Sequence, residues 1–351
     1  MADIQSYQIT GKNFLAVDEN KADLVNFLST ELSKVVPNTG CELVVSGGFT
    51  DPKQVTSSNA DHDISGLSST QEEADTRIIF HACEASSCGF QRIVICARDT
   101  DILALLLAFR HDIAAEEIFM KSGTYQKPKY VAIHRTSLGD QFRRSLLQFH
   151  ALTGSDTTSQ FSSIGKKTAW KVFCTDDNAR LLEDLGTEPR CSPDVLKNVE
   201  AFVCKLYKPT CTTTSIQSLR SSMFRTSIKD LGSLPPTQDS LVQHIQRVNH
   251  QAFIWRNAAV ALVDPQEPLL SGWKIENNLL IPILMMQEPV PANYLQLSAC
   301  GCSRTGSQCR TRQCLCTKAG LRCTVACACA HGSDPDDDWC KNPNNHDICN
   351  T

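Results

Sequence analysis

The sequence predicts an α/β fold, followed by a mostly helical region and a small cysteine-rich domain. Three observations predict this order. Short β-type runs alternate with helical spacing over residues 17–150, helical spacing dominates residues 176–286, and ten of the 18 cysteines lie within residues 300–349. A chain of 351 residues with 41% hydrophobic content is long enough to bury more than one core.

The first half of the chain alternates between the two element types. Apolar residues at helical intervals predict a helix over 17–35, and residues 41–48 have the pattern of a strand that ends in a glycine turn. Thr70 and Glu73 have the spacing of a capping box, which predicts a helix from Thr70. The next expected elements are a buried strand over 92–97, a helix over 101–110, β runs over 116–122 and 129–135, and helices over about 137–150. This order predicts a parallel or mixed sheet with helices on both faces.

Targeting and charge patterns narrow the class of protein. The amino terminus lacks the basic and then apolar layout of a signal peptide, and no apolar run approaches the roughly 20 residues of a membrane span. We therefore expect no membrane partner and an intracellular protein, cytoplasmic on these patterns alone. The net charge of −4 does not decide between partners, because nucleic-acid-binding patches are local.

Two acidic residues, Asp99 and Asp101, directly follow the predicted strand 92–97. In an open α/β sheet, residues just beyond the carboxyl end of a strand line the functional crevice. Carboxylates on a short turn are typical ligands of Mg²⁺. The alternative is that one of the two caps the following helix, since Asp is a favoured N-cap residue.

Further acids precede and follow this pair. Glu73 and Asp75 lie at the start of the preceding helix, and Asp156 lies at a glycine turn after a later helix. Singly, each has an ordinary explanation in helix-dipole or loop chemistry. Together with Asp99 and Asp101 they form the set of carboxylates that a two-metal phosphodiester enzyme needs.

The order of three motifs over about residues 65–175 resembles the flap-endonuclease/XPG nucleases of the PIN-like superfamily. The motifs are "EEAD", "ARDTDILAL" and "HALTGSDTTSQFSSIGKKTAWKVF". The resemblance implies a structure-specific DNA endonuclease whose acids bind two Mg²⁺ (or Mn²⁺) ions. The residues that match the family's catalytic and metal-binding acids are Glu73, Asp75, Asp99, Asp101 and Asp156.

The last motif resembles the family's helix–two-turn–helix, which grips the backbone of duplex DNA. The resemblance places Gly165, Lys166 and Lys167 at the DNA phosphates. The chain departs from the family pattern here, with Ser163 in place of a glycine and Lys166 in place of a proline. The family's amino-terminal strand and its aspartates also have no clear counterpart, which indicates a truncated gene model or a partly lost metal site. A catalytically inactive DNA- or protein-binding adaptor that retains the nuclease fold is therefore the alternative function.

The carboxyl-terminal cysteines repeat a C-x-C pattern that is too tight for one zinc finger and suits a polynuclear cluster. Three four-coordinate zinc ions have twelve ligand positions, and nine thiolates fill them when three of the nine bridge two ions each. A disulfide knot is the alternative. The nine expected ligands are Cys300, Cys302, Cys309, Cys314, Cys316, Cys323, Cys327, Cys329 and Cys340.

This spacing resembles the CXC domain of tesmin-type chromatin proteins, a fold around three Zn²⁺ ions that often binds DNA. The resemblance implies a nuclear location, and Arg304, Arg310 and Arg312 as DNA-binding residues, with chromatin or protein partners as competitors. The combination of the two modules also suggests descent from a mobile element. The predicted domains are residues 1–175 (nuclease-like), 176–286 (helical), 287–299 (linker) and 300–342 (zinc cluster).

Other aromatic and histidine residues have helical spacing that indicates packing. His244, Phe253 and Trp255 are expected in the core, while His81 and His150 lie near the acid motifs without a required role. His331 and Cys349 are expected to be bystanders.

Overall fold

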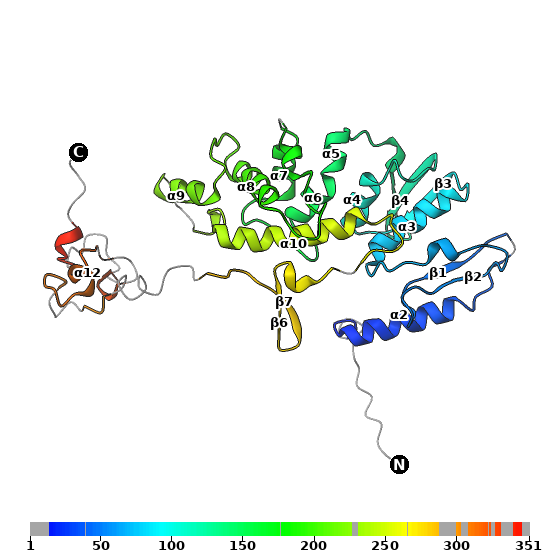
Figure 1. Cartoon of the computed structure of the whole chain (residues 1–351), viewed down its shortest axis with the longest axis horizontal. Coiled ribbons are helices and arrows are strands. Elements are labelled where there is room, and N and C mark those ends of the chain that lie inside the picture. Colours follow the sequence, from blue (N-terminus) through cyan, green and yellow to red (C-terminus); the bar gives the residue numbers. More distant parts are fainter. Residues whose placement is uncertain are drawn as a thin grey trace, which may run out of the picture. The chain divides into compact units, whose positions relative to one another are not determined.

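The computed structural model divides into two compact units, residues 1–284 and 285–351 (Figure 1). Each unit is described by itself. In the part of the chain that the structure describes, no helix is long and apolar enough to cross a membrane. The described residues are 14–38, 40–175, 177–226, 231–264, 266–287, 300–302, 308–321, 323, 327–330 and 340–345.

The first unit begins with a helix and a β-hairpin. Helix α2 (Asp18–Leu32) confirms the helix expected over 17–35, although many of its apolar side chains are exposed, with Phe27 58% exposed. Strands β1 (Val44–Ser46) and β2 (Val55–Ser57) pair antiparallel as a separate two-stranded sheet. A 3₁₀ turn, η1 (Ser65–Leu67), leads towards the next helix.

A three-stranded sheet lies at the centre of the α/β part, in the order β3-β4-β5. Strands β3 (Arg92–Cys96) and β4 (Glu117–Gly123) run parallel, and β5 (Pro128–Ala132) is antiparallel to β4, so the expected mixed sheet is confirmed. The expectation that residues 92–97 form a buried strand is wrong for most of their side chains. Strand β3 is an edge strand, and within it only Ile95 is buried while Val94 is 45% exposed.

Two helices flank strand β3 in the sequence, α3 (Ala74–Ser87) before it and α4 (Thr100–Ala108) after it. The expected capping box is wrong. Glu73 occupies the N-cap position of α3 without a side-chain cap bond, and the Thr70 hydroxyl instead donates to the carbonyl of Val263, 2.9 Å away. Thr70 therefore ties the chain before α3 to a distant segment.

The helical character expected after the sheet is confirmed. Helix α10 (Gln238–Arg256) packs along α6 (Leu146–Leu152), and it also contacts α8 (Pro193–Tyr207) (Figure 1). The side chains of Ser192 and Thr237 cap α8 and α10. The elements are η2 (Ile133–Arg135), α5 (Asp140–Arg144), α6 (Leu146–Leu152), α7 (Lys166–Phe173), η3 (Asn178–Leu182), α8 (Pro193–Tyr207), α9 (Ile216–Thr226), η4 (Leu231–Ser233), α10 (Gln238–Arg256) and η5 (Pro268–Leu270).

A β-hairpin that the sequence analysis did not expect follows α10. Strands β6 (Trp273–Glu276) and β7 (Leu279–Pro282) pair antiparallel around Asn277 and Asn278, which have φ values of 53° and 61°. Two consecutive residues with positive φ are typical of a tight hairpin turn, and asparagine tolerates this conformation better than most residues.

One hydrophobic core runs through the first unit. It joins Leu105 and Leu106 of α4 to Phe173 of α7, Phe202 of α8 and Trp255 of α10. The predicted boundary at residue 175 lies within this unit. Helices far apart in sequence therefore share the core that supports the acid-bearing segments.

The second unit has little regular structure among its described residues. It contains α12 (Leu315–Lys318), η6 (Ala328–Ala330) and η7 (Pro343–Asn345). Its interior is a cluster of cysteines. Arg304, His331, Cys349 and residues 288–299 of the predicted linker lie outside the described residues.

Candidate functional site

Asp99 and Asp101 lie at the junction between β3 and α4, as predicted. The Asp99 carboxylate caps α4 by accepting a hydrogen bond of 2.9 Å from the backbone N–H of Asp101. The capping alternative is therefore correct for Asp99. Asp101 is only 8% exposed and points into the structure, while Asp99 is exposed.

Four of the predicted acids lie near enough to the fifth, Asp75, for their charges to act on it. The pKa of Asp75 is raised from 3.8 to about 6, first by burial and then by the negative charges of the other acids. The charges that act on it belong to Asp99, Glu73, Asp101 and Asp156. We call these five side chains the carboxylate cluster; they come from the start of α3, the β3–α4 junction and the loop after α6.

Helix α10 holds one member of the cluster. The Gln251 amide donates to both carboxylate oxygens of Glu73, at 3.0 and 3.2 Å, and the Trp255 indole N–H donates to Oε2 at 3.2 Å. Gln251 in turn accepts a bond of 2.6 Å from the Thr157 hydroxyl, next to Asp156. Burial raises the pKa of Glu73, and these two donors act against that rise.

The bonds from Gln251 and Trp255 to Glu73 are not predictable from the sequence. The helical spacing of Trp255 predicts only packing. A glutamine on an amphipathic helix carries no local signal for a contact 178 residues away. Trp255 is indeed buried, but its indole N–H also serves the acid.

Two basic groups meet the buried acid of the cluster. His150 Nε2 lies 2.7 Å from Asp101 Oδ1, and the Lys166 ammonium lies 3.1 Å from His150 Nδ1. Since an ammonium can only donate, this arrangement leaves Nδ1 as acceptor and Nε2–H as donor to Asp101. Burial lowers the pKa of Lys166, while the charges of Asp101 and Asp99 oppose that change.

Lys166 thus lies near the carboxylate cluster, and its contact with DNA phosphates stays a prediction. Lys166 and its neighbour Lys167 on α7 are both exposed. Gly165 has an ordinary φ of −78°, and a Cβ added there would meet no atom within 4 Å, so its place in the turn does not depend on glycine. Ser163, which replaces a glycine of the family pattern, has a φ of 63°, in the region that favours glycine.

Close-packed sets of metal-ligand atoms occur in the second unit. Among the described residues, the groups of at least three ligand atoms that lie within 4.8 Å of one another all consist of cysteines. The carboxylate cluster is more open than this. A hard cation such as Mg²⁺ usually keeps several waters and takes only one or two carboxylates directly, so the chemistry of these oxygens still suits it.

The cysteine cluster brings the predicted ligands together. Pairs of sulfur atoms lie 3.6 to 4.0 Å apart, including Cys300–Cys329, Cys316–Cys327 and Cys300–Cys323. Two thiolates on one tetrahedral zinc ion lie about 3.8 Å apart, because each Zn–S bond is about 2.3 Å long. Disulfide sulfurs are about 2.05 Å apart, and none of the described cysteines forms a disulfide. The cluster is thus compatible with zinc binding, and it contains no disulfide among its described members.

Hydrogen bonds from the surrounding chain support the thiols. The buried Asn342 donates through its amide to Cys323 Sγ at 3.1 Å and to the carbonyl of Leu321 at 2.9 Å. The backbone N–H of Cys300 donates to Cys327 Sγ. Burial raises the pKa of Cys316, so a metal ion is needed to hold such a buried thiol as thiolate.

Comparison with known proteins found no match. No protein-family model matches the chain, and neither a curated protein nor a solved structure is similar to it. The protein consists of two compact units, and each has its own set of candidate ligand atoms. The first carries a cluster of oxygen donors and the second a cluster of sulfur donors.

Proposed function

We propose that the chain is a divalent-metal-dependent phosphodiesterase that acts on branched or flapped DNA, in the manner of the nucleases that its motifs resemble. The observation that carries this proposal is that the charges of Glu73, Asp99, Asp101 and Asp156 all act on the half-buried Asp75. Several carboxylates in a half-buried place repel one another, and a divalent cation removes that cost. Mg²⁺ or Mn²⁺ is the cation that these oxygen donors suit.

The side chains of the cluster have separable roles. Bound Mg²⁺ or Mn²⁺ would lower the pKa of an attacking water and stabilise the charge on the leaving oxygen. Gln251 and Trp255 orient Glu73, and His150 orients Asp101. The exposed Asp99 and Asp156 are open to a substrate phosphate that arrives with its cation.

The second unit supports a role in tethering. In the proposed state, nine thiolates hold three Zn²⁺ ions; the close-packed groups of cysteine sulfurs support zinc binding there. Arg310 and Arg312 are exposed beside it and can reach phosphates. Attachment to DNA or chromatin, a nuclear location and descent from a mobile element complete the proposal.

One observation favours the alternative, an inactive adaptor that binds DNA or protein. Asp101 is paired with His150, and Lys166 lies beside them, so part of the negative charge is met without a metal. In an adaptor this arrangement replaces the cation. In an enzyme the cation would replace the contact between His150 and Asp101, and Lys166 would turn towards the substrate.

Cleavage of flapped and branched duplex DNA tests the proposal. We expect the zinc-loaded protein to cut in Mg²⁺ or Mn²⁺, and Asp75→Asn and Asp156→Asn to lower the rate by at least about 100-fold, as loss of a metal ligand does. Asp23→Asn, on exposed α2, is the matched control and retains full activity. Binding without cleavage by the wild type supports the adaptor. Equal cleavage by wild type and Asp75→Asn refutes the catalytic assignment.

A further inference from the structure

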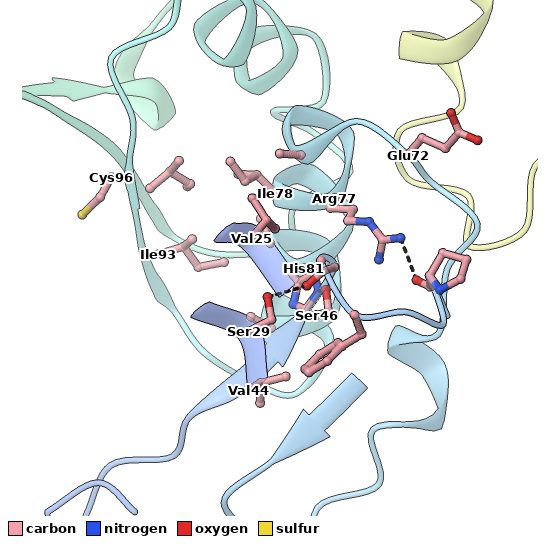
Figure 2. A pocket seen from close by; sticks show the side chains of 18 of the residues that line it. Val25, Ser29, Val44, Ser46, Glu72, Arg77, Ile78, His81, Ile93 and Cys96 are labelled. Carbon is pink, nitrogen blue, oxygen red and sulfur yellow. Dashed lines mark hydrogen bonds between the residues drawn. The ribbon is translucent and has the colours of Figure 1, made fainter. Parts of the chain in front are cut away.

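A cavity lies against helix α3. It has a volume of about 920 Å³ and is bounded by α2, the β1–β2 hairpin, α3 and the edge strand β3 (Figure 2). Apolar side chains form most of its wall, among them Val25 of α2, Ile78 of α3 and Ile93 of β3. Sites for small organic molecules are typically of this size, apolar, and equipped with few polar groups.

The cavity contains one buried cation, Arg77. Its side chain is only 8% exposed. Nη2 donates to the carbonyl oxygen of Pro52 at 2.8 Å and to that of Ser69 at 3.4 Å (Figure 2). Nη1 is buried and has no hydrogen-bond partner among the described residues. An unpaired buried donor on a charged group is costly, so a native structure that retains one calls for a missing partner.

No carboxylate within the described residues pairs with this guanidinium. Glu72 lines the same cavity but forms no ion pair with Arg77. Burial is the one cause that lowers the pKa of Arg77, which agrees with the absence of a neighbouring negative charge. A buried arginine is normally paired with an anion.

Ser46 and His81 are neutral polar groups that line the same cavity. His81 Nε2 lies 2.6 Å from the Ser46 hydroxyl, and burial together with the charge of Arg77 lowers the pKa of His81 (Figure 2). The Ser29 hydroxyl donates to the carbonyl of Gly47. Gly47 has a φ of 80°, which favours glycine, and a Cβ there would be in ordinary contact with Arg77 Cδ at 3.4 Å. The cavity therefore offers hydrogen bonds and the positive charge of Arg77, and its lining also includes the carboxylate of Glu72.

We propose that this cavity binds a small organic anion, a carboxylate or phosphate group on an apolar body. The anionic oxygens pair with the Arg77 guanidinium, and Ser46 and His81 supply neutral hydrogen bonds. Val25, Ile78 and Ile93 contact the apolar body. Arg77 and Asp75 are two residues apart on α3 and face different sides of it, so the site is separate from the carboxylate cluster and does not depend on the proposed nuclease activity.

Calorimetric titration of the full-length, zinc-loaded protein tests this proposal. The probes are phenyl phosphate, benzoate and the neutral benzyl alcohol, in buffer without Mg²⁺ so that the carboxylate cluster cannot recruit phosphate through a cation. We expect saturable binding of at least one anion. Benzyl alcohol should bind at least about tenfold more weakly, because a charge-assisted hydrogen bond contributes roughly a tenfold to hundredfold gain in affinity. The tighter anion identifies the head group.

Two variants and a control separate the outcomes. Arg77→Met should weaken anion binding by about 10-fold to 100-fold, and Ala85→Phe, which fills the cavity from α3, should abolish it. The exposed Arg190→Met is the matched control and should bind as the wild type does. No saturable binding of either anion, equal binding of benzyl alcohol, or unchanged binding in both variants overturns the proposal. If Arg77→Met does not fold, two measurements still test the proposal. They are the loss of binding in Ala85→Phe and the preference of the wild type for the anions over benzyl alcohol.

Discussion

Replacing Asp75 by asparagine should make the protein more stable at neutral pH when divalent cations other than zinc are absent. The pKa of Asp75 rises from 3.8 in the unfolded reference to about 6 in the folded protein. The folded state then binds more protons than the unfolded state between these two values, so the free energy of unfolding falls as pH rises through this window. Above about pH 6 the full penalty is present.

The size of the effect follows from the shift. Each pKa unit corresponds to about 1.4 kcal/mol, which gives an upper value of about 3 kcal/mol. Asp75 is only partly buried, and solvent screening reduces the expected gain of Asp75→Asn to roughly 1–1.5 kcal/mol. At pH 4 the carboxyl group is protonated in the folded state and about half protonated in the unfolded state, so most of the penalty is absent and wild type and variant should differ little.

Urea unfolding of the zinc-loaded chain at pH 4 and pH 7.5 measures this difference. Asp23→Asn on α2 is the control, and it should follow the wild type at both pH values. Adding Mg²⁺ should stabilise the wild type, by about 2.7 kcal/mol at a hundred times its dissociation constant, and should have less effect on Asp75→Asn. A variant no more stable than the wild type at pH 7.5, or a difference independent of pH, would refute the repulsion among the five acids.

Three further predictions concern other parts of the chain. Trp255→Phe should lower the free energy of unfolding by about 1–2 kcal/mol through loss of the bond to Glu73, and a double-mutant cycle with Glu73→Leu should recover that coupling in urea unfolding. Ser163→Gly should raise the melting temperature, because glycine adopts a φ of 63° without strain, a gain of about 0.5–1 kcal/mol; an unchanged or lower value would contradict the turn geometry. Metal analysis should find about three zinc ions per chain, and Asn342→Ala should lose zinc to a chelator about tenfold faster through loss of the bond to Cys323.

The acids of the candidate site could be predicted because each has a local signature. Asp99 and Asp101 follow a strand, Asp75 lies in the first turn of a helix, and Asp156 follows a glycine. Such positions depend on a few neighbouring residues, and the ends of adjacent elements in an α/β fold tend to meet. The nine cysteines are predictable for the same reason, since their spacing is a local property.

The groups that hold the acids could not be predicted. Gln251 and Trp255 reach Glu73 because α10 packs along α6, and no local pattern specifies that packing. Strand β3 was expected to be buried because its composition is apolar, but burial depends on whether a further strand pairs with its edge. The β6–β7 hairpin has a local signal in the consecutive asparagines Asn277 and Asn278, which favour a tight turn, but the helical spacing around them obscures it.

Helix α10 also decides how the chain can be divided. A fragment that ended at residue 175 would carry every acid of the candidate site, yet it would lack the amide and indole groups that hold Glu73 and the core partners of α6 and α7. The acid-bearing segments consequently do not form an independent domain, because residues of α10 complete their core and hold Glu73. Any shortened isoform, expression fragment or chimera that omits residues 238–256 would retain the sequence signature of the site while losing its arrangement.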